Sequence, residues 1–225
     1  MSLDIFCGYD PREAIAFHTC VNSIIRHASK PVTIHPLALN TIEGYTESHT
    51  DGSNQFIYSR FLVPWLMSWK GRALFIDGDM IVTDDIHKIL EHADSHSAVH
   101  VAKHNYTPKD QTKYLGSKQE AYPRKNWSSV ILWNCAHFAH RQLTPEFIGG
   151  STGEYLHRFT WLKDELIGEL PAEWNWLPDE FGPNKAAKLL HWTCGTPCFH
   201  EYAEAEQASI WHKERQLTQY SAQVT

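Results

Sequence analysis

Short apolar segments that end in polar residues are the feature that most restricts how this chain can fold. Ile5-Phe6-Cys7 runs into Gly8-Tyr9-Asp10, and residues 73–76 run into Asp77-Gly78-Asp79. A brief, continuously apolar run of this kind is typical of a strand covered on both faces. Between the two runs, residues 12–27 follow a proline and carry apolar side chains at helical spacing. Strands that alternate with helices predict an α/β sandwich around a mainly parallel sheet.

The rest of the chain extends this outline as one domain over residues 1–225. We expect further strands at residues 32–37, 80–82, 98–102 and 130–133, and helices at residues 58–69 and 209–220 and from an Asp84 or Asp85 cap to His92. The polar segment 40–54 is predicted to be a loop, and residues 105–125 to be irregular. In parallel sheets the ligand crevice lies beyond the carboxyl ends of the strands, where Tyr9, Asp10 and Asp77 would then gather.

Charge limits the class of ligand. The 225 residues carry a formal net charge of −6. This balance lacks the basic surface that binds duplex DNA or other polyanions, so no nucleic-acid partner is expected. It fits a neutral, sugar-like substrate, or an anion whose charge is neutralised by a metal ion.

Cysteine usage and hydropathy indicate the compartment. The count of five cysteines is odd and no secretory signal precedes them, which indicates reduced thiols and predicts a cytoplasmic location. No apolar run approaches the roughly 20 residues of a membrane span, so no transmembrane segment is expected.

Asp77-x-Asp79 is the first candidate for chemistry. Two carboxylates at the end of a strand can share Mg²⁺ or Mn²⁺, ions that prefer oxygen ligands and substrate phosphates. Gly78 removes the intervening side chain and lets the backbone turn. The alternative is a surface turn without a ligand.

The segment around His191 is the second candidate. Its imidazole suits a third ligand position on Mn²⁺ or Zn²⁺, and Gly195 would let backbone amides approach a phosphate. One alternative is a zinc site of His191, Cys194, Cys198 and His200, whose spacing matches no common structural pattern. The other is an ordinary buried loop.

Single polar residues extend the candidate site. Arg60 could clamp a phosphate or a sugar hydroxyl with its planar fork, or be an exposed arginine at a helix start. Asp164 or Glu165 could orient an acceptor hydroxyl, or belong to a solvated helix face. Ser128 lies in a donor-rich segment that suits a polyhydroxylated ligand, or a turn at a strand entry. Trp174-Asn175-Trp176 has the same two interpretations, a contact with such a ligand or a structural role, and core packing is preferred for its indoles.

Missing motifs exclude other classes. The sequence has no G-x-G-x-x-G after the first strand and no Walker A pattern, so dinucleotide and P-loop enzymes are unsupported. It also has no G-x-S-x-G nucleophile elbow.

Several blocks in order resemble a known family. They are Phe6-Cys7-Gly8-Tyr9-Asp10, Tyr58-Ser59-Arg60-Phe61, residues 74–82 with Asp77-Gly78-Asp79, and the late His191 with Gly195. Over residues 3–200 the chain resembles the GT-A glycosyltransferases, and most closely the retaining family 8 that includes glycogenin and bacterial lipopolysaccharide galactosyltransferases. The block around Asp77 is the specific part of this resemblance.

The resemblance implies a GT-A domain that binds a nucleotide sugar with Mn²⁺ or Mg²⁺. Asp77 and Asp79 match the family's metal ligands, and His191 its third protein ligand. Asp164 or Glu165 falls near the acidic segment that lines the donor sugar and the acceptor, and so is the implied catalytic position. The implied contacts to the nucleotide sugar come from Tyr9, Asp10, Arg12, Arg60, Asp77, Gly78, Ser128 and Gly195.

Two departures from the family stand out. The late family motif is His-x-x-Gly-x-x-Lys-Pro-Trp, whereas here Gly195 comes one residue later and no lysine follows. Lys125, Lys185 and Lys188 are the candidates to replace the phosphate-binding lysine. Trp127-Ser128-Ser129 stands where the family usually has Asn-x-Gly, which leaves the donor sugar open.

The expected function is a cytoplasmic, metal-dependent glycosyltransferase of the hexosyltransferase kind. It would move a sugar from a nucleoside-diphosphate sugar, with UDP preferred, to a glycan or other hydroxyl acceptor with retention of configuration. The ion would stabilise charge on the departing nucleotide. The alternatives are a sugar-1-phosphate nucleotidyltransferase and a non-catalytic carbohydrate- or zinc-binding module.

Overall fold

A six-stranded sheet forms the centre of the structure, a computed structural model that describes residues 2–109 and 123–219. The strand order is β2-β1-β3-β6-β5-β7. The strands are β1 (Leu3–Gly8), β2 (Val32–Leu37), β3 (Arg72–Ile76), β5 (Val99–Ala102), β6 (Val130–Asn134) and β7 (Ile167–Leu170). β1 pairs in parallel with β2 and β3, and β5 pairs in parallel with β7, whereas β6 runs antiparallel to β3 and β5. The predicted α/β fold with a mainly parallel sheet is confirmed.

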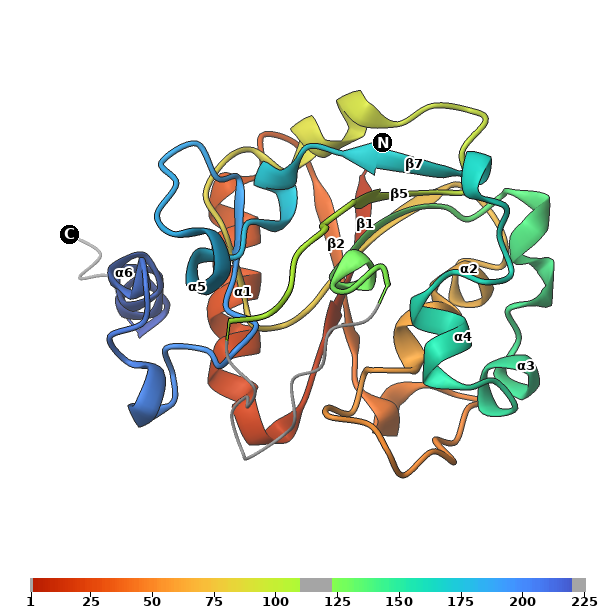
Figure 1. The fold of residues 1–225 in the computed structure, drawn as a ribbon, viewed down its shortest axis with the longest axis horizontal. Helices are drawn as coiled ribbons and strands as arrows, with labels where there is room; N and C mark the ends of the chain where they lie inside the picture. The colour runs from red at the N-terminus through yellow and green to blue at the C-terminus, as the bar shows by residue number, and fades with distance from the viewer. Residues whose placement is uncertain (1, 110–122, 220–225) are drawn as a thin grey trace.

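Helices cover both faces of the sheet (Figure 1). α1 (Ala14–His27) packs on one face, and α2 (Val63–Leu66), α3 (Pro145–Gly149) and α4 (Gly153–His157) lie on the other. Alternate residues of each strand enter different cores: Ile5 faces α1, and its neighbour Phe6 joins the core under α2. This two-sided burial explains the continuous apolar runs in the central strands β1, β3 and β6.

A second, two-stranded sheet brings distant parts of the chain together. β4 (Met80–Val82) pairs antiparallel with β8 (Leu189–His191), and Met80 stands opposite His191. α6 (Ala208–Gln219) packs against α1, where Arg26 and Glu214 form an ion pair at 2.7 Å. α5 (Pro178–Phe181) precedes β8. This ladder positions the candidate site, because β4 leaves Asp77-Gly78-Asp79 directly.

Local structure departs from the predictions at residues 58–69 and at two strands that were not predicted, β7 and β8. The predicted helix over residues 58–69 is wrong: a 3-10 turn, Ser59–Leu62, leads into the four-residue α2, and Ser68 and Trp69 both have φ of 52°. β8 was not predicted, because its three residues have no period of their own.

Other predictions are confirmed or lie partly outside the described residues. The Asp85 cap is confirmed, since its carboxylate accepts from the His87 N–H at the start of a 3-10 helix over Ile86–His92. The predicted irregular segment 105–125 and the helix end at residue 220 fall partly outside the described residues. The assignment of one domain over residues 1–225 stays a prediction. In the two described ranges, no helix has the length and apolar character needed to cross a membrane.

Candidate metal centre and adjoining pocket

Asp77 and Asp79 project from the tight turn that joins β3 to β4. The Asp77 N–H donates to the Ser129 carbonyl at 3.1 Å, which fixes the turn to the entry of β6. A Cβ at Gly78 would lie 2.1 Å from the carbonyl oxygen of Gly8 at the end of β1. Only glycine fits that approach, so the residue between the two aspartates is dictated by packing of the turn on β1.

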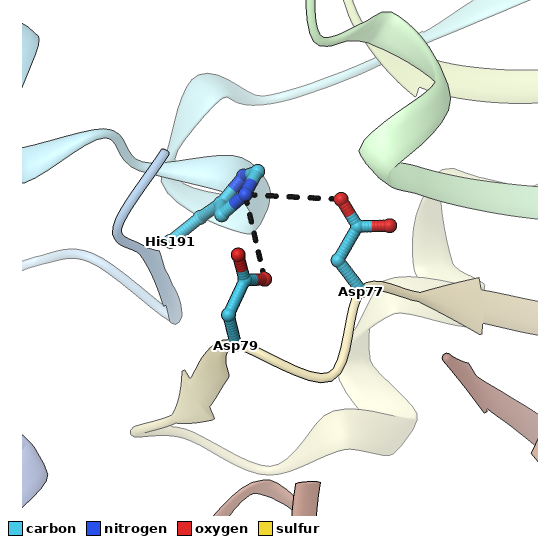
Figure 2. Close-up of side chains that lie close together, drawn as sticks. All are labelled: Asp77, Asp79 and His191. Atoms are coloured by element: carbon cyan, nitrogen blue, oxygen red, sulfur yellow. Dashed lines mark ion pairs between the residues drawn. The ribbon is translucent and has the colours of Figure 1, made fainter. Parts of the chain in front are cut away.

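His191 completes a cluster with the two aspartates (Figure 2). Its Nε2 lies 3.5 Å from Asp79 Oδ1 and 3.8 Å from Asp77 Oδ2. Over residues 2–109 and 123–219, this is the one group of three or more histidine, cysteine or acidic side chains whose ligand atoms lie within 4.8 Å of one another. The structure therefore brings together the three predicted ligands, and does not gather the alternative zinc set of His191, Cys194, Cys198 and His200.

The hydrogen bond on the far side of the His191 ring selects its tautomer. Nδ1 lies 3.0 Å from Asn175 Oδ1, and Asn175 Nδ2 donates to the carbonyl of Asn126 at 3.0 Å. Because the amide oxygen accepts, Nδ1 carries the proton, and the Nε2 lone pair faces the two carboxylates. Metal-binding histidines are commonly held by this kind of partner on the other ring nitrogen.

The cluster fits a divalent cation. Oxygen ligands about 2.1 Å from Mg²⁺ in an octahedron lie about 3 to 4 Å from each other, which brackets the distances measured here. Asp77 Oδ1 and Asp79 Oδ1 are buried and accept no hydrogen bond. Buried carboxylate oxygens without donors are costly unless a cation compensates them. Two carboxylates and one imidazole are all ligand types that divalent cations accept.

Arg60 is the positively charged side chain that pairs with Asp77. Its Nη1 lies 2.8 Å from Asp77 Oδ1, in an ion pair without the angle of a hydrogen bond, and donates to the Ser128 carbonyl at 2.9 Å. The guanidinium packs against the rings of Phe56 and Phe75, and Arg60 is only 3% exposed. The alternative of a solvated arginine is therefore wrong. Burial raises the pKa of Asp77 to about 6, although Arg60 acts in the opposite direction.

A pocket of about 480 Å³ opens beside Asp77. Arg60, Asp77 and Ser128, all predicted site residues, line it. Its other walls include Asp51 and Tyr58 from the segment before α2, and Asn126 with a left-handed φ of 61°. Its volume and its polar lining suit a sugar ring.

Asp10 and Arg12, two of the predicted nucleotide-contact residues, bind the loop that forms one side of this pocket. Asp10 is buried and accepts hydrogen bonds from Arg12 and from the backbone N–H of Gln55. Arg12 also donates to the Ser53 carbonyl at 2.8 Å. Tyr9 is half-buried and meets Phe17 edge-on at 5.2 Å. Their contacts to a nucleotide stay a prediction.

The remaining predicted positions are not members of the cluster. Asp164 and Glu165 are exposed on a 3-10 turn, and neither lines the pocket; Asp164 pairs with Arg124 at 2.6 Å. Their catalytic role stays a prediction. Gly195 is buried, and a Cβ there would lie 2.3 Å from the ring of Tyr202, so packing accounts for this glycine. Of the three lysines considered as phosphate ligands, Lys125 is buried and adjoins the pocket wall at Asn126.

Two site residues were missed by sequence reasoning. The sequence pattern favours core packing for the tryptophans on either side of Asn175, and Trp174 is indeed fully buried. His157 lines the pocket, and its Nδ1 lies 2.6 Å from Ser128 Oγ. Neither residue has a motif, since each partner is distant in the sequence.

Sequence comparison finds a relative that matches most of the chain. No protein-family profile matches the chain. Protein CDI of Arabidopsis thaliana is 40% identical over 219 residues, which cover 93% of this chain and 85% of that protein.

Solved structures share the fold at low sequence identity. The galactosyltransferase LgtC, solved with donor and acceptor sugar analogues, matches with a TM-score of 0.67 at 11% identity over 98% of both chains. The glycosyltransferase GlyE of Streptococcus pneumoniae gives 0.65 at 12% identity, over 96% of this chain and 60% of its own. The bifunctional glycosyltransferase WbbM gives 0.67 at 16% identity, and this chain spans 49% of its length. The fold is therefore of the GT-A kind.

Proposed function

The chain belongs to the family of Protein CDI of Arabidopsis thaliana, and we propose that it is a metal-dependent glycosyltransferase that uses a nucleoside-diphosphate sugar. The observation that carries this proposal is the cluster of Asp77, Asp79 and His191 beside a polar pocket on a GT-A fold. Both glycosyltransferases LgtC and GlyE share that fold. We propose Mn²⁺ or Mg²⁺ as the ion, and a UDP-sugar as the donor.

The bound ion would neutralise the diphosphate and stabilise its developing charge as the glycosidic bond breaks. Asp77, Asp79 and His191 Nε2 would hold it. Arg60 would keep Asp77 ionised and present positive charge to the pocket, where the donor sugar would lie. Because the ion supplies positive charge, a protein with net charge −6 can bind an anionic donor.

Retention of configuration is proposed from the resemblance to family 8, and the pocket is consistent with it. Its two other carboxylates are already engaged: Asp51 accepts from the Tyr58 hydroxyl at 2.6 Å, and Glu154 pairs with Arg158. Such groups suit stabilisation of a cationic sugar better than strong general base catalysis. The acceptor hydroxyl would then attack from the side of the leaving diphosphate, whose oxygen takes the proton.

Thermal unfolding with UDP, GDP, CMP or ADP, each with and without Mn²⁺, tests the proposal. A ligand at about 100 times its Kd adds about 2.7 kcal/mol, which for this chain length is a shift of about 5–10 °C. We expect one diphosphate with Mn²⁺ to give that shift, and the Asp77→Asn, Asp79→Asn double variant to lose it. Glu43→Gln with Glu91→Gln, which removes two exposed carboxylates, is the charge-matched control.

A positive result is followed by incubation with UDP-sugars and Mn²⁺, in which slow donor hydrolysis reports the reaction before the acceptor is known. Release of pyrophosphate from a nucleoside triphosphate would instead favour the nucleotidyltransferase alternative. Full donor hydrolysis by the double variant would refute the metal-dependent mechanism.

A further inference from the structure

Asn175 links the candidate metal ligand to the wall of the pocket. It is fully buried at the end of a 3-10 turn, Ala172–Asn175, and both halves of its amide are used. The oxygen lies 3.0 Å from His191 Nδ1, and the nitrogen donates at 3.0 Å to the carbonyl of Asn126. Asn126 lines the pocket, while His191 faces Asp77 and Asp79.

The donor and the acceptor of each hydrogen bond determine where the protons lie, from Asn126 through Asn175 to His191. A backbone carbonyl can only accept, so the NH₂ group of Asn175 must face Asn126. The amide oxygen must then face His191, whose Nδ1 must donate to it. Nε2 is left as a lone pair directed at the two carboxylates. Without the amide, a proton on Nε2 would satisfy Asp79, and a protonated nitrogen cannot bind a metal ion.

The backbone beside Asn175 holds His191 as well. The Lys188 N–H donates to the Glu173 carbonyl at 2.8 Å, the Trp176 N–H donates to the Leu189 carbonyl at 2.9 Å, and the His191 N–H donates to the Trp176 carbonyl at 2.8 Å. The segment 173–176 therefore runs along β8 and anchors both the main chain and the side chain of the ligand.

Asn126, whose carbonyl accepts the second hydrogen bond of Asn175, has a strained backbone in the pocket wall. Asn126 has φ 61° and ψ 8°, a left-handed conformation, and its side chain lies 2.5 Å from the Tyr106 hydroxyl. Two residues later, the Ser128 carbonyl accepts from Arg60, the partner of Asp77. A hydrogen bond to the Asn126 carbonyl stabilises the turn that presents Ser128 to the pocket.

We propose that Asn175 is a positioning residue that sets the tautomer of His191 and couples its place in the metal centre to the pocket wall at Asn126. This inference rests on the proposed function for the identity of the ion. The two hydrogen bonds of Asn175 have separate roles. The bond to His191 supports metal binding, and the bond to Asn126 supports the shape of the donor-sugar pocket.

Three variants separate these roles. Asn175→Ala removes both hydrogen bonds. Asn175→Asp keeps an acceptor for His191 Nδ1 but has no donor for the Asn126 carbonyl. Asn134→Ala is the matched control, because Asn134 Nδ2 also donates to a backbone carbonyl, that of Ser97, and Asn134 pairs with Arg72 at the opposite end of β3 from Asp77.

The first measurement needs no metal and no substrate. Imidazole ¹⁵N spectra of the metal-free protein at pH 8, with the His191 signals assigned by their loss in His191→Asn, report which ring nitrogen carries the proton. We expect the Nδ1–H form in the wild type, in Asn175→Asp and in Asn134→Ala, and the Nε2–H form in Asn175→Ala.

The second measurement is Mn²⁺ titration followed by the electron paramagnetic resonance of free Mn²⁺. Loss of such a partner typically weakens metal affinity by about 10–100-fold, which we expect for Asn175→Ala. We expect Asn175→Asp to bind Mn²⁺ like the wild type but to show a raised KM for hydrolysis of the UDP-sugar. Asn134→Ala should match the wild type in both properties.

The outcomes distinguish the inference from the proposed function. A wild type that binds no Mn²⁺ overturns the proposed metal chemistry, whereas the ¹⁵N spectra still test the tautomer. Asn175→Ala that keeps the Nδ1–H form and the wild-type Mn²⁺ affinity overturns the role of Asn175 alone. An unchanged KM in Asn175→Asp overturns the coupling to Asn126.

Discussion

His49 and His191 belong to two polar clusters whose hydrogen-bonding needs are met to different extents. The first cluster consists of Glu47, His49, Asp51 and Tyr58, and the second of Asp77, Asp79 and His191. His49 Nδ1 lies 2.6 Å from Glu47 Oε1, and its Nε2 lies 2.8 Å from the Ser151 carbonyl. His191 has one such partner, Asn175, and its Nε2 faces carboxylates at 3.5 and 3.8 Å.

The difference distinguishes a structural cluster from the proposed metal-binding one. The ring of His49 stacks on Tyr58 at 3.6 Å between centroids, and the Tyr58 hydroxyl donates to Asp51, so the first cluster satisfies its own groups. In the second cluster, Asp79 Oδ1 is buried and accepts no hydrogen bond, and Asp77 Oδ1 has only the ion pair with Arg60. We propose that the first cluster stabilises the fold, whereas the second binds a ligand that supplies the missing partner.

The largest expected effect is on metal affinity in the second cluster. Asp79→Asn removes one anionic ligand, and we expect Mn²⁺ affinity to fall by about 100-fold, or about 2.7 kcal/mol. The same change should raise the melting temperature of the metal-free protein, because it removes a buried charge beside Asp77. Calorimetric titration and thermal unfolding measure the two effects. A metal-free variant less stable than the wild type would contradict the view that this cluster awaits a ligand.

The opposite pattern is expected for the first cluster. His49→Gln breaks a charged hydrogen bond and the link between Glu47 and Ser151, so we expect a loss of about 2 kcal/mol in the free energy of unfolding. Mn²⁺ affinity should stay at the wild-type value. Urea unfolding and Mn²⁺ titration test both statements, with exposed His18→Gln as the control. A large loss of Mn²⁺ affinity in His49→Gln would erase the distinction.

The pH dependence of stability should follow the first cluster. Burial works to lower the pKa of His49, but its hydrogen bonds to Glu47 and the Ser151 carbonyl outweigh burial and hold the pKa above its ordinary value. Both ring nitrogens face acceptors, so the folded protein favours the protonated ring. This stabilisation is complete below the pKa of histidine in the unfolded chain, and is lost as the pH rises through the higher pKa of the folded protein. Urea unfolding across that range should show the decline in the wild type and a smaller one in His49→Gln.

The smallest effect on stability is expected at the exposed acidic pair. Asp164 pairs with Arg124, but its side chain is 82% exposed, so Asp164→Asn should change the free energy of unfolding by less than about 0.5 kcal/mol. Its metal affinity should equal that of the wild type. If Asp164→Asn sharply reduces sugar transfer to an acceptor and leaves donor hydrolysis unchanged, the predicted catalytic role is supported. Unchanged transfer would remove Asp164 from the site.

The parts of the fold and of the site that depend on local sequence could be predicted. The apolar strand before Asp77 and the glycine after it predicted both the sheet and the carboxylate turn. The place of His191 came from the resemblance to family 8, because its pairing with Met80 joins distant segments. Burial of Arg60 could not be predicted, since its partners Asp77 and Ser128 come from other strands' ends.

The clusters themselves show why the remainder was missed. Loop 40–54 has the composition of an ordinary polar loop, and nothing local signals that His49 reaches Ser151. The role of Asn175 depends on two hydrogen bonds, to Asn126 and to His191, which are not adjacent to it in the sequence. The predicted helix over residues 58–69 failed because tertiary packing of Arg60 and the left-handed Ser68 and Trp69 outweighed helical periodicity.

Pairing of β4 with β8 also determines when the site can exist during synthesis. A ribosome releases Asp77 and Asp79 long before it adds His191, so the nascent chain first carries a bare acidic turn at the end of β3. The third proposed ligand, His191, is added with β8, the strand that pairs with β4. Contacts of such large sequence separation form late, because the loop between them must be closed first. The proposed cation site would therefore be completed as one of the last steps of folding.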